Sequence, residues 1–454
     1  MTNGPAYRST SSGGEDRHAL GLWISPQFDQ LECSLVRMRG RQAGASIEIR
    51  HSFRRPIMGD LAAWGRGGDS PPARTFVGND PTAYLAWRQE LTEIQVDAVA
   101  DLLADARIAP SEILLLGADD PGIWGKEPEG GYLPLTDPIA LAERTGMNVL
   151  SAFPARDVVR GGRGGPILAL PDWVLLRAGS KDRVLVRFGE SVRMSYLPRA
   201  SIDNPRNRIL SLELLPSLDW FEHLERERSE GVGFDPDTVG MDALRAKDGA
   251  AVLTGMQGAS EVGESMLDSC VDEKLLASWL AVLDASSSSS PVEWTPSSLG
   301  KSSLCEALHA TTRECLTGSQ ANTRATAIAL AAEAVAKAMD ESLPLESNPR
   351  EIVVHAEEGD ATLFRREIAS RKKKVKVLST SELGVEEGTL DAVGVAMLCF
   401  LYLDQVPGNL PLLTGADVGR VLGELTPGSP QSWQILLQEL GGSAAAIRPL
   451  RSAL

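Results

Sequence analysis

The chain has 454 residues, of which 43% are hydrophobic, so it can bury two or three core-forming units. Its formal net charge of −16 argues against non-specific nucleic-acid binding, which depends on Lys and Arg contacts to phosphate. No apolar run reaches the roughly 18–20 residues that a membrane span needs, and the first 18 residues lack the apolar stretch of a secretory signal. We therefore expect a cytoplasmic protein without nucleic-acid or membrane partners, with residues 1–17 as a disordered tail.

The cysteines and histidines give no sign of a disulfide framework or a zinc site. The five cysteines lack C-x-x-C spacing, and an odd number cannot all pair within one chain, which favours a reducing compartment. The five histidines also lack metal-ligand spacing. The basic run 371–374 is a local exception to the acidic composition, and we interpret it as a solvated turn before a strand.

The first third of the chain predicts a strand meander followed by alternating helices and strands. Three alternating stretches, 18–24, 31–38 and 45–53, predict antiparallel strands. A Gly/Pro/Arg-rich loop at 65–74 precedes further elements, which are a helix over 81–104, a strand over 113–116, a helix over 137–145 and a strand over 149–152. This order is typical of one lobe of the actin-like sugar-kinase and heat-shock-protein ATPase architecture, although other α/β folds share part of it.

The remainder predicts a second α/β unit. The expected elements are strands at 184–188, 209–214, 352–355 and 375–378, and helices at 220–228, 322–339, from 361, and 390–403 as the last helix. Five serines at 286–290 indicate a flexible insertion over 285–291. We therefore expect lobe I over 18–150 and lobe II over 151–454.

A Gly-rich loop follows the strand predicted at 149–152. It holds Arg156 and Asp157, and its glycines Gly161, Gly162 and Gly164 allow a ligand or another chain segment to approach the backbone closely. From the residues alone, Asp157 is more simply a helix cap or a turn residue, and action on a bound substrate is the alternative.

This part of the chain resembles anhydro-N-acetylmuramic acid kinases. Their Asn-Pro-x-x-x-Ala-Glu-x-Thr-Gly segment matches residues 137–146, and their Arg-Asp-(Val/Met)-Ala-Ala-Gly-Gly-Gln-Gly-Ala-Pro-Leu segment matches residues 156–167. Residues 407–423, PGNLPLLTGADVGRVLG, resemble the closing Gly-Asn-Leu-Pro-x-Val-Thr-Gly-Ala signature, and weaker matches lie at 233–240 and 322–326. The matches are collinear from about residue 19 to 425.

The resemblance implies a two-lobed actin-like (ribonuclease H-like) α/β fold, ATP and Mg²⁺ as cofactors, and an amino sugar as the small-molecule partner. Family members open 1,6-anhydro-N-acetylmuramic acid with water and phosphorylate O6, and they often form homodimers. By the match, Asp157 is the general base on the water. Arg156, Gly161, Gly162 and Gly164 would line the sugar pocket, together with Asp391, which stands where the family has a glutamate before its last helix.

The first predicted hairpin, residues 21–32, departs from the family pattern Gly-(Leu/Val)-Met-Ser-Gly-Thr-Ser-Leu-Asp-Gly-(Ile/Val)-Asp. Pro26 offers no N–H donor, and Gln27 replaces a small hydroxyl residue. Ser25, Gln27 and Asp29, with Gly189 further along, are the degenerate nucleotide or phosphate positions. Asp29 could still orient Mg²⁺ through water, or it could be an ordinary turn residue.

Other family loops have changed as well. The Ser-His-Gly-Gln-Thr position reads ADDPG at 118–122, and one glycine of the Asn-Ile-Gly-Gly loop remains at 186–189. No glycine remains at 212–218 or at 355–357, where bulk and negative charge would oppose a polyphosphate.

Three hypotheses follow from these matches and departures. The first is the family's ATP-dependent sugar kinase activity. The second is a catalytically inactive pseudokinase that binds a muropeptide sugar or a protein, in which case the chain requires no cofactor. The third is an altered enzyme that uses another phosphoryl donor or sugar, with a metal held among the carboxylates Asp119, Asp120, Asp157, Glu213 and Asp391.

Overall fold

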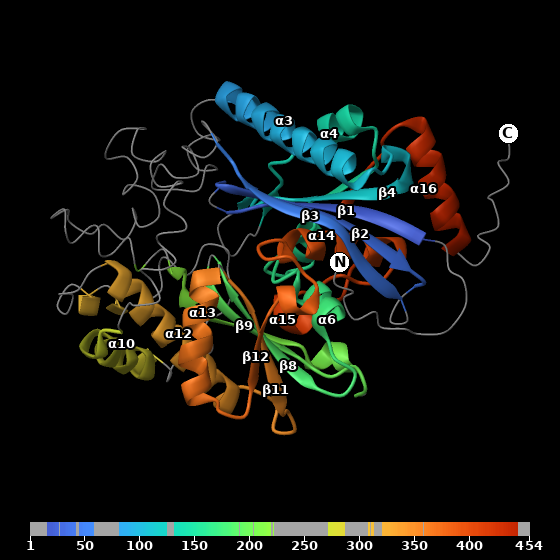
Figure 1. Ribbon diagram of the computed structural model, residues 1–454. Coiled ribbons are helices and arrows are strands. Elements are labelled where there is room, and N and C mark those ends of the chain that lie inside the picture. The colour runs from blue at the N-terminus through green and yellow to red at the C-terminus, as the bar shows by residue number, and fades with distance from the viewer. Residues whose placement is uncertain are drawn as a thin grey trace.

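The computed structural model describes residues 16–443 except 27, 42–44, 59–80, 125–130, 190, 203, 219–220, 222–270, 287–306, 309, 313–319 and 357. The predicted tail, the loop at 65–74, nearly all of the serine insertion, most of the helix at 220–228 and the match at 233–240 therefore lie outside the described residues. Two β-sheets dominate the structure, one in each half of the view in Figure 1.

The first sheet has six strands in the order β13-β7-β4-β1-β2-β3. β1 (Asp16–Ile24), β2 (Gln30–Arg39) and β3 (Ser46–Pro56) form an antiparallel meander. β4 (Ile113–Asp119) runs parallel to β1, and β7 (Val149–Ser151) runs parallel to β4. The three-residue strand β13 (Glu424–Thr426) then pairs antiparallel with β7, so a segment near the end of the chain closes this sheet.

The second sheet repeats the plan of the first. β8 (Asp182–Phe188), β9 (Ser191–Leu197) and β10 (Leu210–Pro216) form an antiparallel meander. β11 (Pro349–His355) is parallel to β8, and β12 (Lys376–Ser379) is parallel to β11. The order β10-β9-β8-β11-β12 thus matches β3-β2-β1-β4-β7 strand for strand. This repeat confirms the predicted two-lobed, ribonuclease H-like α/β architecture.

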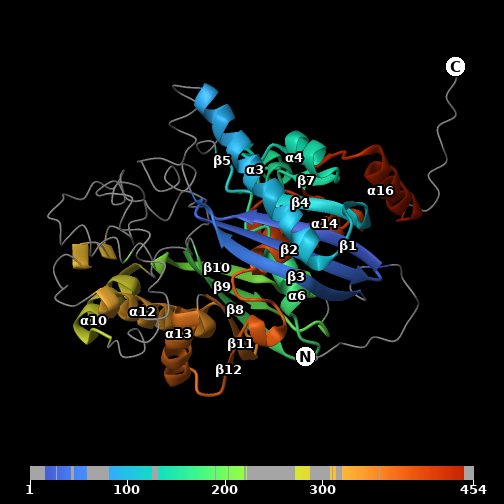
Figure 2. The ribbon, with the colours of Figure 1, turned by 45° about the horizontal axis from the view of Figure 1, so that its top comes forward.

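Helices cover both faces of each sheet, as Figures 1 and 2 show. On the first sheet, α3 (Pro81–Ala106) and α4 (Pro138–Thr145) cover one face, and α14 (Leu390–Leu403) and α16 (Pro430–Ser443) cover the other. In the second lobe, α10 (Glu273–Ser286), α12 (Gln320–Glu341) and α13 (Glu358–Arg371) form a layer beside the sheet. The small side chains of the Ala-rich α12 allow α10 and α13 to pack closely against it, and almost all of them are buried.

α14 and α6 (Ala169–Leu176) lie between the two sheets. One buried cluster joins Leu150 of the first sheet, Val393 of α14, Leu170 of α6 and Leu185 of the second sheet. α14 also approaches β1 so closely that a Cβ on Gly21 would lie 2.0 Å from the Ala392 carbonyl oxygen. Glycine is therefore required at this contact.

Short elements complete the chain. They are β5 (Ile123–Trp124), β6 (Tyr132–Leu133), α5 (Ala155–Val159), α15 (Pro411–Thr414) and the 3₁₀ turns η2 (Pro110–Glu112), η3 (Pro205–Arg208) and η6 (Ser381–Leu383). Among the described residues, no helix combines the length and apolarity that a bilayer crossing requires.

The sheet membership differs from the lobe boundaries expected from the sequence. The strands of the second sheet lie within residues 182–379. After them, β13 joins the first sheet and α14 and α16 pack on it, so these three elements belong with lobe I and not with lobe II. The helix at 390–403 is not the last one, because α15 and α16 follow it. β9 and α10 were also not among the expected elements.

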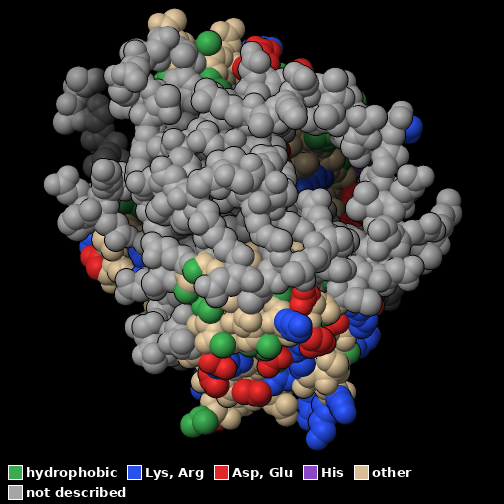
Figure 3. All heavy atoms as spheres, turned by 90° about the vertical axis from the view of Figure 1, so that its left-hand side faces the viewer, with side chains coloured by type: hydrophobic (Ala, Val, Ile, Leu, Met, Phe, Trp, Pro, Cys, Tyr) green, Lys and Arg blue, Asp and Glu red, His purple; other side chains and the backbone are tan. Residues whose placement is uncertain are grey.

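Charged side chains of both signs occupy the helical layer of the second lobe, on the lower part of the face in Figure 3. On α13 and just after it, Arg371 Nε bonds to Glu333 at 2.6 Å and Lys372 Nζ bonds to Asp340 at 2.5 Å. Two cations of the basic run are thus paired with acids of α12. This pairing is consistent with the surface turn expected for the run.

Candidate functional site

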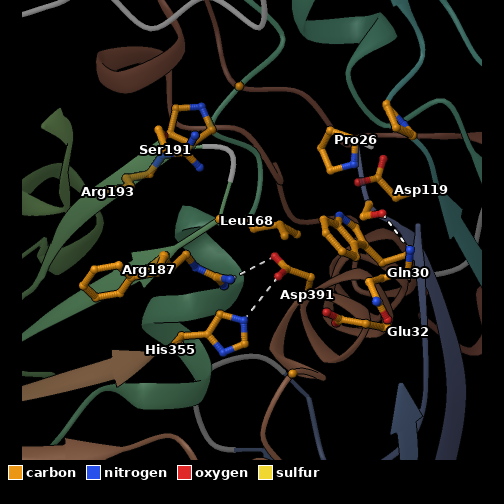
Figure 4. Close-up of a pocket in the computed structure, with 18 of the residues that line it drawn as sticks. Pro26, Gln30, Glu32, Asp119, Leu168, Arg187, Ser191, Arg193, His355 and Asp391 are labelled. Carbon is orange, nitrogen blue, oxygen red and sulfur yellow. Dashed lines mark hydrogen bonds and ion pairs between the residues drawn. The ribbon is translucent and has the colours of Figure 1, made fainter. Parts of the chain in front are cut away.

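A cavity of about 380 Å³ opens between the two lobes. The hairpin β1–β2 contributes Ser25 and Asp29, the hairpin β8–β9 contributes Gly189 and Arg193, and the first turn of α14 contributes Asp391. Figure 4 shows that side chains from both lobes converge on this space. A cavity of this size, lined by convergent polar groups at a domain junction, has the features of a small-molecule site.

Four ionisable side chains, three of them buried, meet on one side of the cavity. Arg187, at the end of β8, forms a bidentate pair with the Asp172 carboxylate of α6, and its Nη1 lies 2.9 Å from Asp391 Oδ1. His355, at the end of β11, places Nε2 3.5 Å from Asp391 Oδ2. Because α14 packs on the first sheet and β8 and β11 belong to the second, this cluster ties the lobes together (Figure 4).

The electrostatics of this cluster set the ionisation of three carboxyl groups. Burial alone would raise the pKa of Asp391, but the charge of Arg187 and the hydrogen bond from His355 outweigh burial and hold this pKa at about 2. Burial raises the pKa of Asp172 despite its pairing with Arg187. Burial and the nearby Asp391 charge raise the pKa of Glu32 well above its ordinary value. Asp391 is therefore the most firmly ionised of the three.

Glu32, His355 and Asp391 each offer a ligand atom, and these atoms lie within 4.8 Å of one another. Two carboxylates and an imidazole form a reasonable donor set for a divalent cation. However, the guanidinium of Arg187 already bonds to Asp391 and places a fixed positive charge beside this position. The described contacts therefore favour an ion-pair cluster over a metal centre at this point.

At the tip of the β1–β2 hairpin, polar groups form hydrogen bonds with one another within the turn. The Ser25 hydroxyl accepts from the backbone N–H groups of Asp29, at 3.1 Å, and Gln30, at 2.9 Å, and it donates to Asp29 Oδ1 at 2.6 Å. Phe28 N donates to the Ser25 carbonyl, and Pro26 has no N–H to offer. Hence the described residues of this tip do not fit a polyphosphate held by backbone donors. Gln27 lies outside the described residues.

Two neighbouring carboxylates differ in what they can bind. Asp120 is occupied, since it accepts hydrogen bonds from the backbone N–H groups of Gly122, Leu135 and Thr136, each at 2.9 Å. Asp119 lines the cavity near Pro26 (Figure 4), and Asp29, whose Oδ1 accepts from the Ser25 hydroxyl, also belongs to the lining. Carboxylate oxygens are the ligands that Mg²⁺ prefers, so the chemistry of these two side chains suits a divalent cation even though the hairpin tip does not fit phosphate.

Asp157 lies in a different environment from the one its predicted role suggests. Its side chain is fully buried, Oδ2 accepts from Gly164 N at 2.9 Å, and Oδ1 accepts from Asn409 Nδ2 at 2.6 Å. A Cβ on Gly162 would lie only 2.0 Å from Asp157 Oδ2, which explains the glycine there. Asn409 belongs to the 407–423 signature, so Asp157 joins the two segments that resemble the kinase family.

The predicted site residues that the structure describes fall into two groups. Ser25, Asp29, Gly164, Gly189 and Asp391 line the cavity. Arg156, Asp157, Gly161 and Gly162 do not line it, and the contacts of Asp157 are those of a residue that holds a loop. The base role of Asp157 and the sugar contacts of Arg156, Gly161 and Gly162 therefore remain predictions.

Sequence reasoning missed three ionic residues of the cavity, namely Arg187, Asp172 and His355. Arg187 and His355 each follow an apolar run of three residues, VLV in β8 and IVV in β11. A charged residue at the carboxyl end of a buried strand is a signal for a site at that edge of the sheet, and it could have identified both.

Comparisons with known proteins agree with this architecture. The family model for anhydro-N-acetylmuramic acid kinase matches residues 82–202 and 294–428, more than half of the chain. An anhydro-N-acetylmuramic acid kinase of Cupriavidus pinatubonensis is 26% identical over 419 residues, which cover 91% of this chain and 98% of that protein. The enzyme of the same name from Xanthomonas campestris is 24% identical over 422 residues, with coverages of 90% and 97%.

Solved structures resemble the chain only distantly. Component A of the (R)-2-hydroxyglutaryl-CoA dehydratase of Acidaminococcus fermentans aligns with a TM-score of 0.37 at 10% identity, over 85% of this chain and 98% of that one. A likeness of this degree carries no argument about activity. The matched segments include both the Gly-rich loop around Asp157 and the closing segment that contains Asn409, which contact each other in the fold. The chain belongs to the anhydro-N-acetylmuramic acid kinase family.

Proposed function

We propose that the protein is a kinase for 1,6-anhydro-N-acetylmuramic acid, which adds water across the anhydro bond and transfers a phosphoryl group to O6 of the opened sugar. The observation that carries the proposal is the family match across both lobes, with a cavity of about 380 Å³ where those lobes meet. A sugar kinase needs such a junction because positioning and charge stabilisation supply most of the catalysis of phosphoryl transfer.

ATP and Mg²⁺ are the cofactors that this function implies. The carboxylates of Asp29 and Asp119 would hold the cation, which would balance charge on the phosphates when bound. The β1–β2 tip offers no described backbone donor to a polyphosphate, so positive side chains that line the cavity would have to take that role. Arg193 and Arg324 are the examples, and they would have to exchange their present partners, Glu213 and Asp360, for phosphate. This difference from the family pattern makes nucleotide binding the first property to measure.

Asp157 is the proposed general base on the attacking water. In the described conformation its carboxylate is buried and bonded to Gly164 N and Asn409 Nδ2. The proposal therefore requires the loop 157–164 to shift when the sugar binds, so that the carboxylate can reach a water molecule. Catalytic hydrogen bonds often tighten only in the substrate complex, which makes such a shift compatible with the buried position of this carboxylate.

The test is an assay of the full chain with Mg-ATP and 1,6-anhydro-N-acetylmuramic acid, read by ³¹P NMR for a sugar 6-phosphate. We expect product from the native protein and at least a hundredfold lower kcat from Asp157→Asn. Asp417→Asn is the matched control, because Asp417 also contacts this loop region, through Arg160, but is exposed. Circular dichroism must show that both variants are folded.

Each outcome of this assay has a definite reading. Absence of product from the native protein at millimolar Mg-ATP would refute the kinase function, and sugar binding without product would favour the inactive, sugar-binding alternative. Full activity in a folded Asp157→Asn protein would refute the role of Asp157 and leave the kinase function standing. A small-molecule sugar partner is thus tested directly, whereas the homodimer and the cytoplasmic location remain predictions that light scattering and cell fractionation can test.

A further inference from the structure

Two polar contacts beside the cavity join the lobes through a single carboxylate. Asp391 lies in the first turn of α14, which packs on the first sheet. Arg187 and His355 belong to β8 and β11 of the second sheet. Arg187 Nη1 lies 2.9 Å from Asp391 Oδ1, and His355 Nε2 lies 3.5 Å from Asp391 Oδ2 (Figure 4). Each oxygen of this carboxylate thus has a partner in the other lobe, and we call the two pairs the interlobe contacts.

The interlobe contacts are shielded from water. The side chains of Arg187 and His355 are each 10% exposed, and that of Asp391 is 16% exposed. Shielding of this degree strengthens a contact between charged groups and makes a charge without a partner costly. The Asp391 carboxylate therefore does not leave its two partners unless other donors, a cation or water replace them.

Arg187 also holds a second carboxylate, and this one lies in its own lobe. The guanidinium bonds through Nε and Nη2 to both carboxylate oxygens of Asp172 in α6. α6 is fastened to the second sheet, because it contacts β9 and because Trp173 Nε1 donates to the Pro198 carbonyl at 2.8 Å. One guanidinium thus bonds to Asp172 within a lobe and to Asp391 between the lobes.

Behind the interlobe contacts the lobes meet through apolar side chains. Leu185 lies two residues before Arg187, Val393 lies two residues after Asp391, and both belong to the buried cluster between the sheets. The chain passes between the two sheets in two segments, 152–181 and 380–389. Apolar contact has no preferred direction, whereas a hydrogen-bonded ion pair fixes both a distance and an angle. This arrangement suits a rotation of the lobes about the apolar cluster that the ionic groups limit.

We propose that the interlobe contacts hold the two lobes closed over the cavity while no ligand is bound. They keep the first turn of α14 against the ends of β8 and β11, and so they keep the cavity at its volume of about 380 Å³. Loss of these contacts lets the lobes rotate about the apolar cluster, which widens the cavity. The proposal concerns the protein without ligand, so it does not depend on the kinase function.

Two amide substitutions form a matched pair for the test. Asp391→Asn and Asp172→Asn each remove one negative charge beside Arg187, and each leaves this arginine with one carboxylate partner. Neither variant therefore buries an unpaired cation, which would be strongly destabilising. Only Asp391→Asn removes the charge that both interlobe contacts share. His355→Gln is a milder variant, because it alters one of the two contacts and leaves the Arg187–Asp391 pair in place.

The distance between the lobes is measured in the full-length protein by pulsed electron spin resonance. Spin labels are attached through a non-natural keto amino acid in place of Glu143 of α4 and Glu341 of α12, two exposed positions, which leaves the native cysteines unlabelled. Without ligand, Asp391→Asn should broaden the distance distribution and shift its mean by more than about 2 Å, the scale of a hinge rearrangement. Asp172→Asn should keep the native distribution, and His355→Gln should broaden it less than Asp391→Asn does.

Two results would overturn the proposal. One is a native distance distribution in Asp391→Asn protein that circular dichroism shows to be folded. The other is an equal shift in Asp172→Asn, which would indicate an effect of the lost charge and not of a lost contact between the lobes. If Asp391→Asn does not fold, His355→Gln decides the question, and an unchanged distribution in that variant would refute the role of the interlobe contacts.

Discussion

Replacement of Arg187 by Met should strongly destabilise the protein at neutral pH. The change removes the counter-ion of the buried carboxylate of Asp172 and the largely buried carboxylate of Asp391, and it keeps most of the apolar stem. Holding the pKa of Asp391 near 2, against an ordinary 3.8, corresponds to about 2–3 kcal/mol at roughly 1.36 kcal/mol per pKa unit. With the loss at Asp172 added, we expect the free energy of unfolding to fall by about 3–5 kcal/mol.

The pH dependence gives this prediction its sign. A carboxyl group with a lowered folded-state pKa contributes stability above its unfolded pKa, and it loses that contribution as the pH falls through its folded pKa. Asp391 therefore stabilises the native protein at pH 7.5 and does so less below about pH 4. In the variant both carboxylates can take up protons, so its deficit should shrink between pH 7.5 and pH 4.

The assay is urea unfolding followed by tryptophan fluorescence at these two pH values. Arg208→Met, which removes an exposed ion pair with Glu346 at 3.4 Å, should cost less than about 1 kcal/mol at either pH. A loss below 1 kcal/mol for Arg187→Met at pH 7.5, or a loss that does not depend on pH, would refute the argument that this arginine balances buried charge.

Two further predictions concern the contact between β1, β2 and α14. Gly21→Ala should lower the free energy of unfolding by at least about 2 kcal/mol, because the new Cβ would lie 2.0 Å from the Ala392 carbonyl oxygen. Gly179→Ala is the control and should have little effect, because nothing lies within 4 Å of a Cβ at that position. Equal effects of the two substitutions in urea unfolding would contradict the close approach of α14 to β1. Glu32→Gln should become more stable relative to the native protein as the pH rises from 5 to 9, because the raised folded-state pKa of Glu32 contributes stability only at low pH and loses it as the pH rises through that value. A stability difference that is constant over this range would show that Glu32 is ionised in the native protein.

Local patterns predicted most of the secondary structure. The alternating strands and the helices at 81–104, 322–339 and 390–403 lie where the sequence put them, because their apolar periodicity is determined by the faces they bury. β9 (Ser191–Leu197) was missed since it carries serines at buried positions, which weakens its apolar signal. β13 (Glu424–Thr426) is three residues long, and its pairing with β7 depends on a contact across more than 270 residues that no local pattern records.

The site was less predictable than the fold. Pro26 and its neighbours predicted that the β1–β2 turn has lost its hydrogen-bond donors to phosphate. The structure agrees, because the backbone N–H groups of Asp29 and Gln30 donate to the Ser25 hydroxyl within the turn. The strand-end positions of Arg187 and His355 could have marked each residue, but no local pattern shows that both contact Asp391. They lie on separate strands, and Asp391 lies on a helix that packs on the other sheet. Only the parallel pairing of β8 with β11 brings them together.

The return of the chain to the first sheet has a consequence for synthesis on the ribosome. The second sheet is contiguous in sequence, 182–379, and can form as soon as it has emerged. The first sheet begins with β1 but receives α14 only at residues 390–403 and β13 only at 424–426. Until then the α14-facing side of β1 and β2 has no cover. The N-terminal lobe, although translated first, is therefore the last to be completed, and a nascent chain halted before residue 390 exposes an apolar sheet face of the kind that chaperones bind.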